Sequence, residues 1–372
     1  MSETPVGIGI IGCGNISGAY LKAAPHFPIL AVRACADLNP EVAQAKAAEF
    51  GVAARTIDQL LADPEIEIVV NLTTPQAHVP VGLQAIAAGK HVHSEKPLAI
   101  SVAEGRKLLD AATAKGLRVG CAPDTFLGAG QQTARALIDA GRIGRPVAGT
   151  AFMMVPGHER WHPNPDFYYA KGGGPLFDMG PYYLTTLVNM LGPVARVTGT
   201  VAAAYAERRI ASGPRAGQIV PVGTPTHITG TLAFASGAVV TLVMSFDIPA
   251  HRHAPIEIYG ETASLSVPDP NIFGGELQIS VPLPERKVAW QTETTGHAYG
   301  DGNYRIIGVA DMAHAIRAGR PHRASAELAF HVLEVMEAME RSGQEGRPIE
   351  IESRCARPEP MPVEPAFSRA AA

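Results

Sequence analysis

The sequence predicts two domains, an N-terminal doubly wound α/β domain with a parallel sheet and a C-terminal α+β domain with a large open antiparallel sheet. The chain of 372 residues is longer than the ~150 residues of an ordinary domain. In its first third, short apolar runs alternate with helical segments, which is typical of a parallel sheet. Further on, longer segments of alternating polarity are joined by short turns, which favours hairpins.

The composition excludes several classes of protein. With 46% hydrophobic and 18% charged residues, the chain can bury a large core and is not disordered. A net charge of −4 without a basic run argues against a nucleic-acid partner. No apolar stretch approaches the ~20 residues of a membrane span, and the N-terminus does not resemble a signal peptide. The 4 scattered cysteines, without a CxxC pair, favour a reducing cytoplasm.

The N-terminal domain, expected at residues 1–124, contains five apolar runs that we interpret as parallel strands. These are Val6–Ile11, Leu30–Ala36, Ile66–Leu72, His91–Ser94 and Arg118–Ala122. Helices are expected between them at Glu41–Phe50 and Val79–Ala88, each followed by a glycine suited to end a helix. Ser101 and Glu104 form a capping-box pattern that begins a further helix.

The C-terminal domain, expected at residues 125–354, begins with a helix near Gln131–Ala140. The expected strands are Pro146–Val155, Ala195–Tyr205, His227–Phe234, Ala238–Asp247, Ile256–Tyr259, Ser264–Val267 and Leu277–Val281. Two further helices, near Tyr304–Ala318 and Ala326–Ser342, are expected to end the domain. Helices are expected to cover one face of the sheet. The other face is expected to bind a second subunit, which predicts a homodimer or homotetramer. Residues 355–372, rich in Pro and Ala, are expected to form a loose tail.

A glycine-rich turn follows the first strand. The segment GIIGCGNIS contains the pattern Gly12-x-Gly14-x-x-Ser17. The first glycine permits a tight turn and the second lets the backbone approach a pyrophosphate. Asn15 and Ile16, at the start of the next helix, offer backbone N–H groups and the positive end of a helix dipole.

The acid at the end of the second strand predicts the choice of dinucleotide. Asp37 follows Gly14 by 23 residues, where a carboxylate binds ribose hydroxyls and repels a 2′-phosphate. The next residue is Leu38 and not an arginine, so NAD is predicted as cofactor over NADP. The alternative is that Asp37 only caps the helix that begins near Pro40.

Two further stretches identify a family. NLTTPQAH at Asn71–His78 and HVHSEKPLAIS at His91–Ser101 resemble the Gfo/Idh/MocA oxidoreductases, and Glu95-Lys96-Pro97 is the most specific motif. The resemblance extends to about residue 345. It implies that Lys96 is catalytic, hydrogen-bonding a substrate hydroxyl and the nicotinamide ribose, and that the Lys96–Pro97 bond is cis. It also implies a cofactor crevice lined by further residues, namely Thr73, Thr74, Pro75, His78 and Glu95. His78 is alternatively a polar residue of a helix N-terminus.

The segment KGGGPLFDMGPYYLTTL at 171–187 resembles the second signature of the family, with two departures. Asp178 stands at the aspartate position, but Tyr182 replaces the usual catalytic histidine and Thr185 the second aspartate. Positions 178, 182 and 185 share one face of a helix. The resemblance implies that Asp178 and Tyr182 are catalytic and contact substrate. Alternatively, Asp178 caps its helix and Tyr182 is an aromatic residue of the core. The arginine common in the family is missing from Cys121–Phe126.

The segment GHERWHPNPDFYY at 157–169 precedes this helix. Its aromatic and hydrogen-bonding side chains suit a sugar or polyol, which makes His158, Trp161 and His162 candidate substrate contacts. A histidine of this loop is the alternative base to Tyr182, and simple loop packing is the alternative for each of the three. His251 and His253 lack further converging ligands, so no metal site is expected.

Taken together, the residues and the resemblance predict an NAD-dependent oxidoreductase. It would transfer a hydride between a secondary hydroxyl of a sugar, cyclitol or related polyol and nicotinamide. One alternative is an NAD-dependent glycosidase of the same family, in which the hydride is borrowed and returned. The other is a cofactor-binding regulator without turnover.

Overall fold

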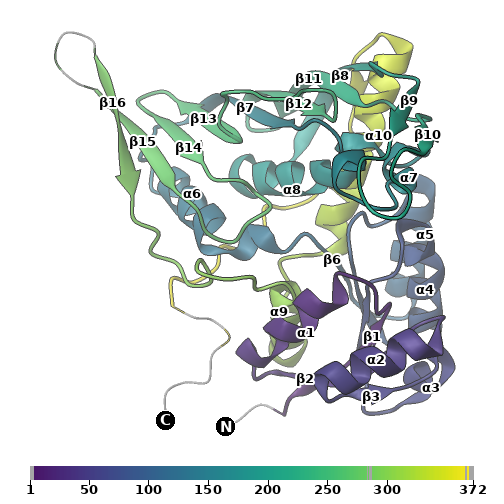
Figure 1. Ribbon diagram of the computed structural model, residues 1–372. Coiled ribbons are helices and arrows are strands. Elements are labelled where there is room, and N and C mark those ends of the chain that lie inside the picture. Colours follow the sequence, from purple (N-terminus) through teal and green to yellow (C-terminus); the bar gives the residue numbers. More distant parts are fainter. Residues whose placement is uncertain (1–3, 283, 285–286, 365–366, 368–372) are drawn as a thin grey trace. The chain divides into compact units, whose positions relative to one another are not determined.

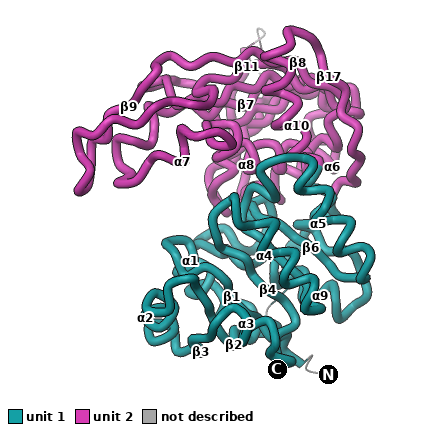
Figure 2. Tube along the Cα trace, turned by 90° about the vertical axis from the view of Figure 1, so that its right-hand side faces the viewer, with its two compact units in different colours: residues 1–129, 296–330, 358–372 teal, residues 130–295, 331–357 magenta. Residues whose placement is uncertain are grey.

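The computed structural model describes residues 4–282, 284, 287–364 and 367 (Figure 1). The chain divides into two compact units, and both are discontinuous in sequence (Figure 2). Unit 1 contains residues 1–129, 296–330 and 358–372, and unit 2 contains residues 130–295 and 331–357. The sequence suggested contiguous domains at 1–124 and 125–354. The difference arises because the chain returns to unit 1 after it has completed most of the second sheet.

Unit 1 contains the predicted parallel sheet. Its six strands follow the order β3-β2-β1-β4-β5-β6, and every neighbouring pair is parallel. The strands are β1 Val6–Ile11, β2 Leu30–Ala36, β3 Ala53–Ala54, β4 Ile68–Asn71, β5 His91–Ser94 and β6 Val119–Cys121. All residues of β1 and β4 are buried, which explains why their sequences lack polar alternation. The doubly wound fold class is therefore confirmed.

The helices of unit 1 begin and end where their capping residues allow. They are α1 Ser17–Ala23, η1 Ala24–His26, α2 Pro40–Phe50, α3 Ile57–Ala62, α4 Pro75–Ala87, α5 Val102–Ala114, η2 Thr125–Leu127 and α9 Ile307–Ala318. Gly51 ends α2 with a left-handed φ of 68°. The Ser101 hydroxyl accepts the Glu104 N–H at 3.3 Å and caps α5 as predicted. Helix α4 begins four residues earlier than predicted because Pro75 suits the first helical position.

Helix α9 belongs to unit 1, although the sequence suggested that it closes the second domain. The buried carboxylate of Asp124 accepts the N–H groups of Ile306 at 3.1 Å and Gly308 at 3.0 Å. Burial raises the pKa of Asp124 to about 6. Ile306 has a φ of 96°, so the helix begins at Ile307 and not near Tyr304.

The described part of the C-terminal segment does not form a loose tail, and from residue 358 on it belongs to unit 1. Met361 and Phe367 are buried. The ring of Phe367 stacks on His314 at 5.1 Å between ring centroids. The Arg323 guanidinium donates to the carbonyl of Pro360 at 3.0 Å. Residues 365–366 and 368–372 of the expected tail lie outside the described residues.

Unit 2 contains a nine-stranded sheet in the order β16-β15-β14-β13-β7-β12-β11-β8-β17. Its strands are β7 Pro146–Met154, β8 Val194–Ala202, β11 His227–Phe234, β12 Val239–Ser245, β13 Ile256–Gly260, β14 Ser264–Val267, β15 Leu277–Pro282, β16 Val288–Glu293 and β17 Ile349–Glu350. Neighbours are antiparallel except β7 and β12, which are parallel. The open sheet is thus confirmed as mostly antiparallel but mixed. A second sheet pairs β9 Glu207–Arg209 with β10 Ile219–Pro221.

Helices cover one face of this large sheet, as predicted. They are α6 Ala129–Asp139, α8 Gly174–Leu191 and α10 Ala326–Glu345, and two short helices, η3 His158–Arg160 and α7 Asp166–Tyr169, precede α8. Figure 1 shows α8 along the strands β7, β11 and β12, which it contacts. Gly199 lets α10 approach β8 closely, because a Cβ there would lie 2.4 Å from the Met339 carbonyl oxygen. On the opposite face, Thr231, Val239 and Thr241 are exposed.

Candidate active site

The glycine-rich turn after β1 leaves room for a ligand. Gly12 has a φ of 100°, and a Cβ there would lie 2.6 Å from the Leu72 carbonyl, so this position requires glycine. A Cβ at Gly14 would meet no atom within 4 Å, so the backbone there is open to an approaching group. Ser17 is buried, and its hydroxyl donates to the Gly14 carbonyl at 2.7 Å. Serine therefore serves as the third residue of the motif, while Asn15 stays exposed and Ile16 half-buried.

Asp37 links this turn to the end of β2. Its carboxylate oxygens accept the N–H of Cys13 at 2.8 Å and the N–H of Asn39 at 2.9 Å. Asp37 lines a cavity of about 550 Å³ together with Leu38, Arg55 and other residues of the β2–α3 region. An open glycine turn beside a carboxylate and a cavity fits the adenosine and pyrophosphate of a dinucleotide. The sequence analysis missed Arg55, which reaches this cavity because β3 pairs with β2.

The residues after β4 form the next part of the predicted crevice. Thr74 and Pro75 lie at the start of α4, and Thr73 precedes them. His78 is buried, with Nδ1 2.7 Å from the Pro97 carbonyl and Nε2 3.1 Å from the Thr73 carbonyl. Burial lowers the pKa of His78. These contacts join α4 to the segment after β5.

That segment carries the Glu-Lys-Pro motif. Glu95 is buried, and its carboxylate accepts the Tyr20 hydroxyl at 2.9 Å and the Lys96 N–H at 3.0 Å. The Lys96–Pro97 peptide bond is cis, as the family resemblance implied. Burial and Glu95 raise the pKa of Tyr20, which keeps this phenol neutral. Glu95 thus fixes the backbone from which the half-buried Lys96 projects.

In unit 2, Asp178 and His158 form a close pair. Asp178 lies on α8 and His158 begins η3, and the distance between Asp178 Oδ2 and His158 Nε2 is 2.9 Å. The side chains are 15% and 14% exposed, so both are sheltered and still reachable from solvent. Asp178 lies inside α8, which excludes the alternative that it caps this helix.

Trp161 defines which imidazole nitrogen carries the proton. Its indole Nε1–H donates to His158 Nδ1 at 3.3 Å, and an indole can only donate. His158 Nδ1 therefore carries a lone pair, and Nε2–H donates to Asp178. Trp161 is 59% exposed, so a ligand can reach the contact it makes.

The remaining candidates of unit 2 lie on α8 and in the 157–169 loop. Tyr182 and Thr185 follow Asp178 on the same helix, and both are buried. His162 Nδ1 accepts the Asn164 N–H at 3.1 Å, and its ring packs edge-on against Trp161, Phe167 and Tyr168. The structure thus brings Asp178 together with His158 and Trp161.

Two general findings concern the described part of the chain. Among residues 4–282, 284, 287–364 and 367, no three His, Cys, Asp or Glu side chains gather closely enough to hold a metal ion. Within the same ranges, no helix has the length and apolarity needed to cross a bilayer.

The sequence matches two family models. Residues 6–122 match the oxidoreductase family with an NAD-binding Rossmann fold, and residues 131–266 match the GFO/IDH/MocA C-terminal domain. An uncharacterized oxidoreductase of Rhizobium meliloti is 31% identical over 351 residues, which cover 92% of this chain and 98% of the relative. The chain belongs to the Gfo/Idh/MocA oxidoreductase family. As in that family, unit 1 is an NAD-binding Rossmann domain.

Other Gfo/Idh/MocA relatives have more specific names. A levoglucosan dehydrogenase of Pseudarthrobacter phenanthrenivorans is 26% identical, covering 80% of this chain and 83% of the relative. A 1,5-anhydro-D-fructose reductase of Ensifer adhaerens is 31% identical, but the match covers only 48% of this chain and 54% of the reductase. Among solved structures, an NAD binding oxidoreductase of Klebsiella pneumoniae superposes with a TM-score of 0.80 at 25% identity, covering 94% of this chain and 100% of the other.

Proposed function

We propose that this Gfo/Idh/MocA protein is an NAD-dependent dehydrogenase of a sugar, cyclitol or related polyol. The reaction would transfer a hydride between a secondary hydroxyl-bearing carbon and nicotinamide. The His158–Asp178 pair is the observation that carries the proposal, because it offers a proton acceptor in the substrate domain of an NAD-binding family. The relatives named for levoglucosan and 1,5-anhydro-D-fructose, both carbohydrates, support the substrate class.

His158 would act as the general base. Oxidation of an alcohol requires that the hydroxyl proton leaves as the hydride is transferred. His158 Nδ1 carries the lone pair, while Asp178 orients the ring through Nε2–H and would stabilise the imidazolium that forms. The substrate hydroxyl would replace the Trp161 N–H at Nδ1.

Tyr182 is the weaker candidate for the base, although it occupies the position of the family histidine. Its side chain is 6% exposed. A phenol is also a poorer base than an imidazole at neutral pH. We therefore assign the base to His158 and a packing role on α8 to Tyr182, and leave substrate contact to Trp161, His162 and Asp178.

Unit 1 would bind the dinucleotide, which supplies the hydride acceptor when bound. Gly12, Gly14, Asn15 and Ile16 would hold the pyrophosphate, and Asp37 the adenosine ribose. Thr73, Thr74, Pro75 and Glu95 would line the crevice. Lys96 would hydrogen-bond the reacting hydroxyl and the nicotinamide ribose, as its motif implies. We assign His78 to holding the Pro97 segment, since its two ring nitrogens face backbone carbonyls.

A panel of sugars, cyclitols and anhydrosugars, assayed with NAD and NADP at the absorbance band of the reduced nicotinamide, tests this function. We expect at least one compound to be oxidised with NAD, and His158→Gln to abolish most of that activity. Release of sugar from glycosides without net reduction of NAD would indicate the glycosidase instead. NAD binding without turnover of any compound would indicate the regulator.

We further propose that the protein acts in the cytoplasm as a homodimer or homotetramer. Support for the assembly comes from the nine-stranded sheet, where Thr231, Val239 and Thr241 are exposed on the face that the helices leave open. Cys13, Cys35 and Cys121 are buried and free, which suits a reducing compartment. Light scattering at micromolar concentration tests the assembly, and a monomer would contradict it.

A further inference from the structure

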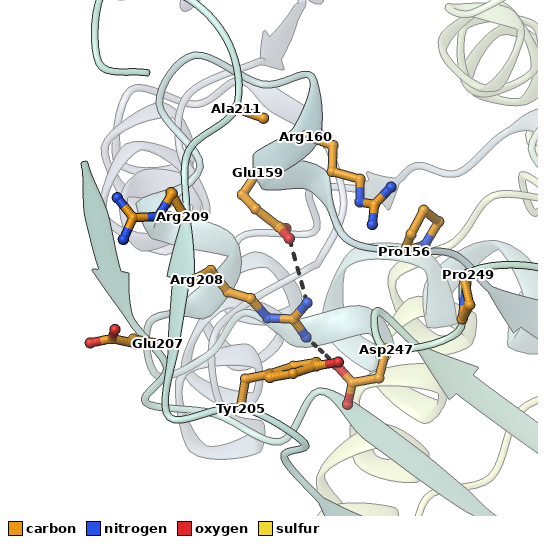
Figure 3. Close-up of a pocket in the computed structure, with 10 residues that line it drawn as sticks. All are labelled: Pro156, Glu159, Arg160, Tyr205, Glu207, Arg208, Arg209, Ala211, Asp247 and Pro249. Atoms are coloured by element: carbon orange, nitrogen blue, oxygen red, sulfur yellow. Dashed lines mark hydrogen bonds and ion pairs between the residues drawn. The ribbon is translucent and has the colours of Figure 1, made fainter. Parts of the chain in front are cut away.

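A buried ionic cluster lies at the turn that carries His158. Its members are Glu159, Tyr169, Arg208 and Asp247, and we call it the Arg208 cluster. Figure 3 shows its three charged residues. The Arg208 guanidinium donates to Glu159 at 3.4 Å and also to Asp247. The Tyr169 hydroxyl donates to the second oxygen of Glu159. The side chains of Arg208, Glu159 and Asp247 are only 7%, 8% and 6% exposed. The cluster lies along a cavity of about 650 Å³.

The members of the cluster come from four separate segments of unit 2. Glu159 lies on η3 directly after His158, Tyr169 ends α7, Arg208 is the central residue of β9, and Asp247 follows β12. Asp247 is itself held by the Thr226 hydroxyl, which donates to it at 2.8 Å. A single guanidinium therefore ties the η3 turn to the segment that follows β12, an inner strand of the large sheet.

The backbone of the turn is shaped around this cluster. Gly157 has a φ of 97°, and a Cβ there would lie 2.3 Å from the Glu159 carboxylate and 2.8 Å from the Tyr169 hydroxyl. The carbonyl of Glu159 also accepts the Ala211 N–H at 2.9 Å. The cluster thus holds Glu159, which follows His158, and requires glycine at position 157, which precedes it.

Stability alone explains this cluster poorly. One guanidinium and two carboxylates are withdrawn from water, and buried ion pairs often stabilise a fold less than apolar side chains of the same volume would. Arg208 Nε is buried and has no hydrogen-bond partner among the described residues. What the cluster does provide is a defined position for η3.

We propose that Arg208 is a positioning residue that holds His158 in hydrogen-bonding distance of Asp178 by anchoring Glu159. For its effect on catalysis, this inference rests on the proposed role of His158 as base. The effect of Arg208 on the geometry of the turn does not depend on the role of His158 as base. Arginine suits the task because the two terminal nitrogens of its rigid planar fork each donate to a different carboxylate, whereas the ammonium of lysine is a single point on a flexible stem.

The distance between Asp178 Oδ2 and His158 Nε2 provides a readout that is independent of activity. It is 2.9 Å in the parent protein. Crystal structures of the parent and of each variant measure this distance directly.

Arg208→Met should displace the η3 turn and lengthen this distance beyond about 3.5 Å, so that the hydrogen bond is lost. It should also lower kcat about 10- to 100-fold with a smaller change in KM, because a displaced base still permits substrate binding. Arg208→Lys should fall between Arg208→Met and the parent in both measurements. Arg135→Met is the matched control, since Arg135 is a buried arginine of the same unit that binds Asp139 and Asn189. Its Asp178–His158 distance and its kcat should match those of the parent.

The proposal is overturned if Arg208→Met keeps the Asp178–His158 distance below about 3.5 Å and kcat within about twofold of the parent, or if Arg135→Met alters both equally. If Arg208→Met does not fold, Arg208→Lys decides in the same way, because it keeps a cation beside the two carboxylates. If no compound of the panel is oxidised, the proposed function fails. The distances in the crystal structures then still decide whether Arg208 positions the turn.

Discussion

Asp178 binds the imidazole of His158, a residue 20 positions earlier in the chain, at a distance of 2.9 Å. The family motif places a histidine four residues after the aspartate, on the same helix, and here that position is Tyr182. The His158–Asp178 pair supplies an imidazole beside the aspartate from a different segment. The predictions below follow from this arrangement and from its surroundings.

Trp161→Phe should raise kcat/KM about two- to fivefold. The substitution keeps an aromatic face but removes the N–H that donates to His158 Nδ1, so the substrate hydroxyl no longer competes with it. One such hydrogen bond contributes about 1 kcal/mol. Steady-state kinetics on the best compound of the panel measure this effect. A loss of more than about tenfold would show instead that the indole N–H binds substrate.

The cofactor preference should depend on Asp37. We expect the protein to favour NAD over NADP at least about tenfold in kcat/KM, since a 2′-phosphate would be repelled by the Asp37 carboxylate. Asp37→Ser should improve kcat/KM with NADP by about tenfold or more, because Arg55 already lines the same cavity.

The double variant Asp37→Ser with Arg55→Ala is the control for this prediction. It should lose most of the gain with NADP, while its activity with NAD should be similar to that of the single variant Asp37→Ser. An equal gain in both variants would exclude Arg55 as the cation that meets the phosphate.

Stability should fall in mild acid because of His331, which is buried on α10. Its Nε2 accepts the Val194 N–H at 2.9 Å and its Nδ1 lies 2.8 Å from the Ser353 hydroxyl, an arrangement that fits the neutral ring. Burial lowers the pKa of His331 from 6.5 to about 4. A depressed histidine pKa means that stability is fully present above about pH 6.5 and is lost as the pH falls towards about 4. The loss amounts to roughly 3 kcal/mol at most.

Urea unfolding at several pH values tests this contribution. His331→Gln keeps an acceptor for Val194 but does not titrate, so the free energy of unfolding should depend less on pH between about 7 and about 5 than in the parent. Parallel pH dependences of the parent and the variant would contradict the assignment.

Local patterns were sufficient to predict most strands and several helix ends. The apolar runs of β1, β2 and β5 have the predicted bounds, and Gly51 and Ser101 end and begin their helices as expected. These features are set by residues close in sequence. The β9–β10 pair was not predicted, because Glu207–Arg209 is short and shows no apolar alternation.

Features that depend on distant residues could not be predicted. Nothing in the local sequence indicates that Asp124 binds the start of α9, which moves this helix into unit 1. The same holds for Arg208, whose role depends on carboxylates 49 and 39 residues away. His158 was one of several candidates in its loop, and only the three-dimensional contact with Asp178 distinguishes it.

The central claim is that His158, and not Tyr182, accepts the proton. The most direct measurement compares kcat of His158→Gln and Tyr182→Phe on the same oxidised compound with NAD. Loss of a general base should lower kcat of His158→Gln by about 10²-fold or more, while Tyr182→Phe should stay within about threefold of the parent. The reverse result, with His158→Gln near normal and Tyr182→Phe reduced about 10²-fold, would contradict the account and return the base to Tyr182.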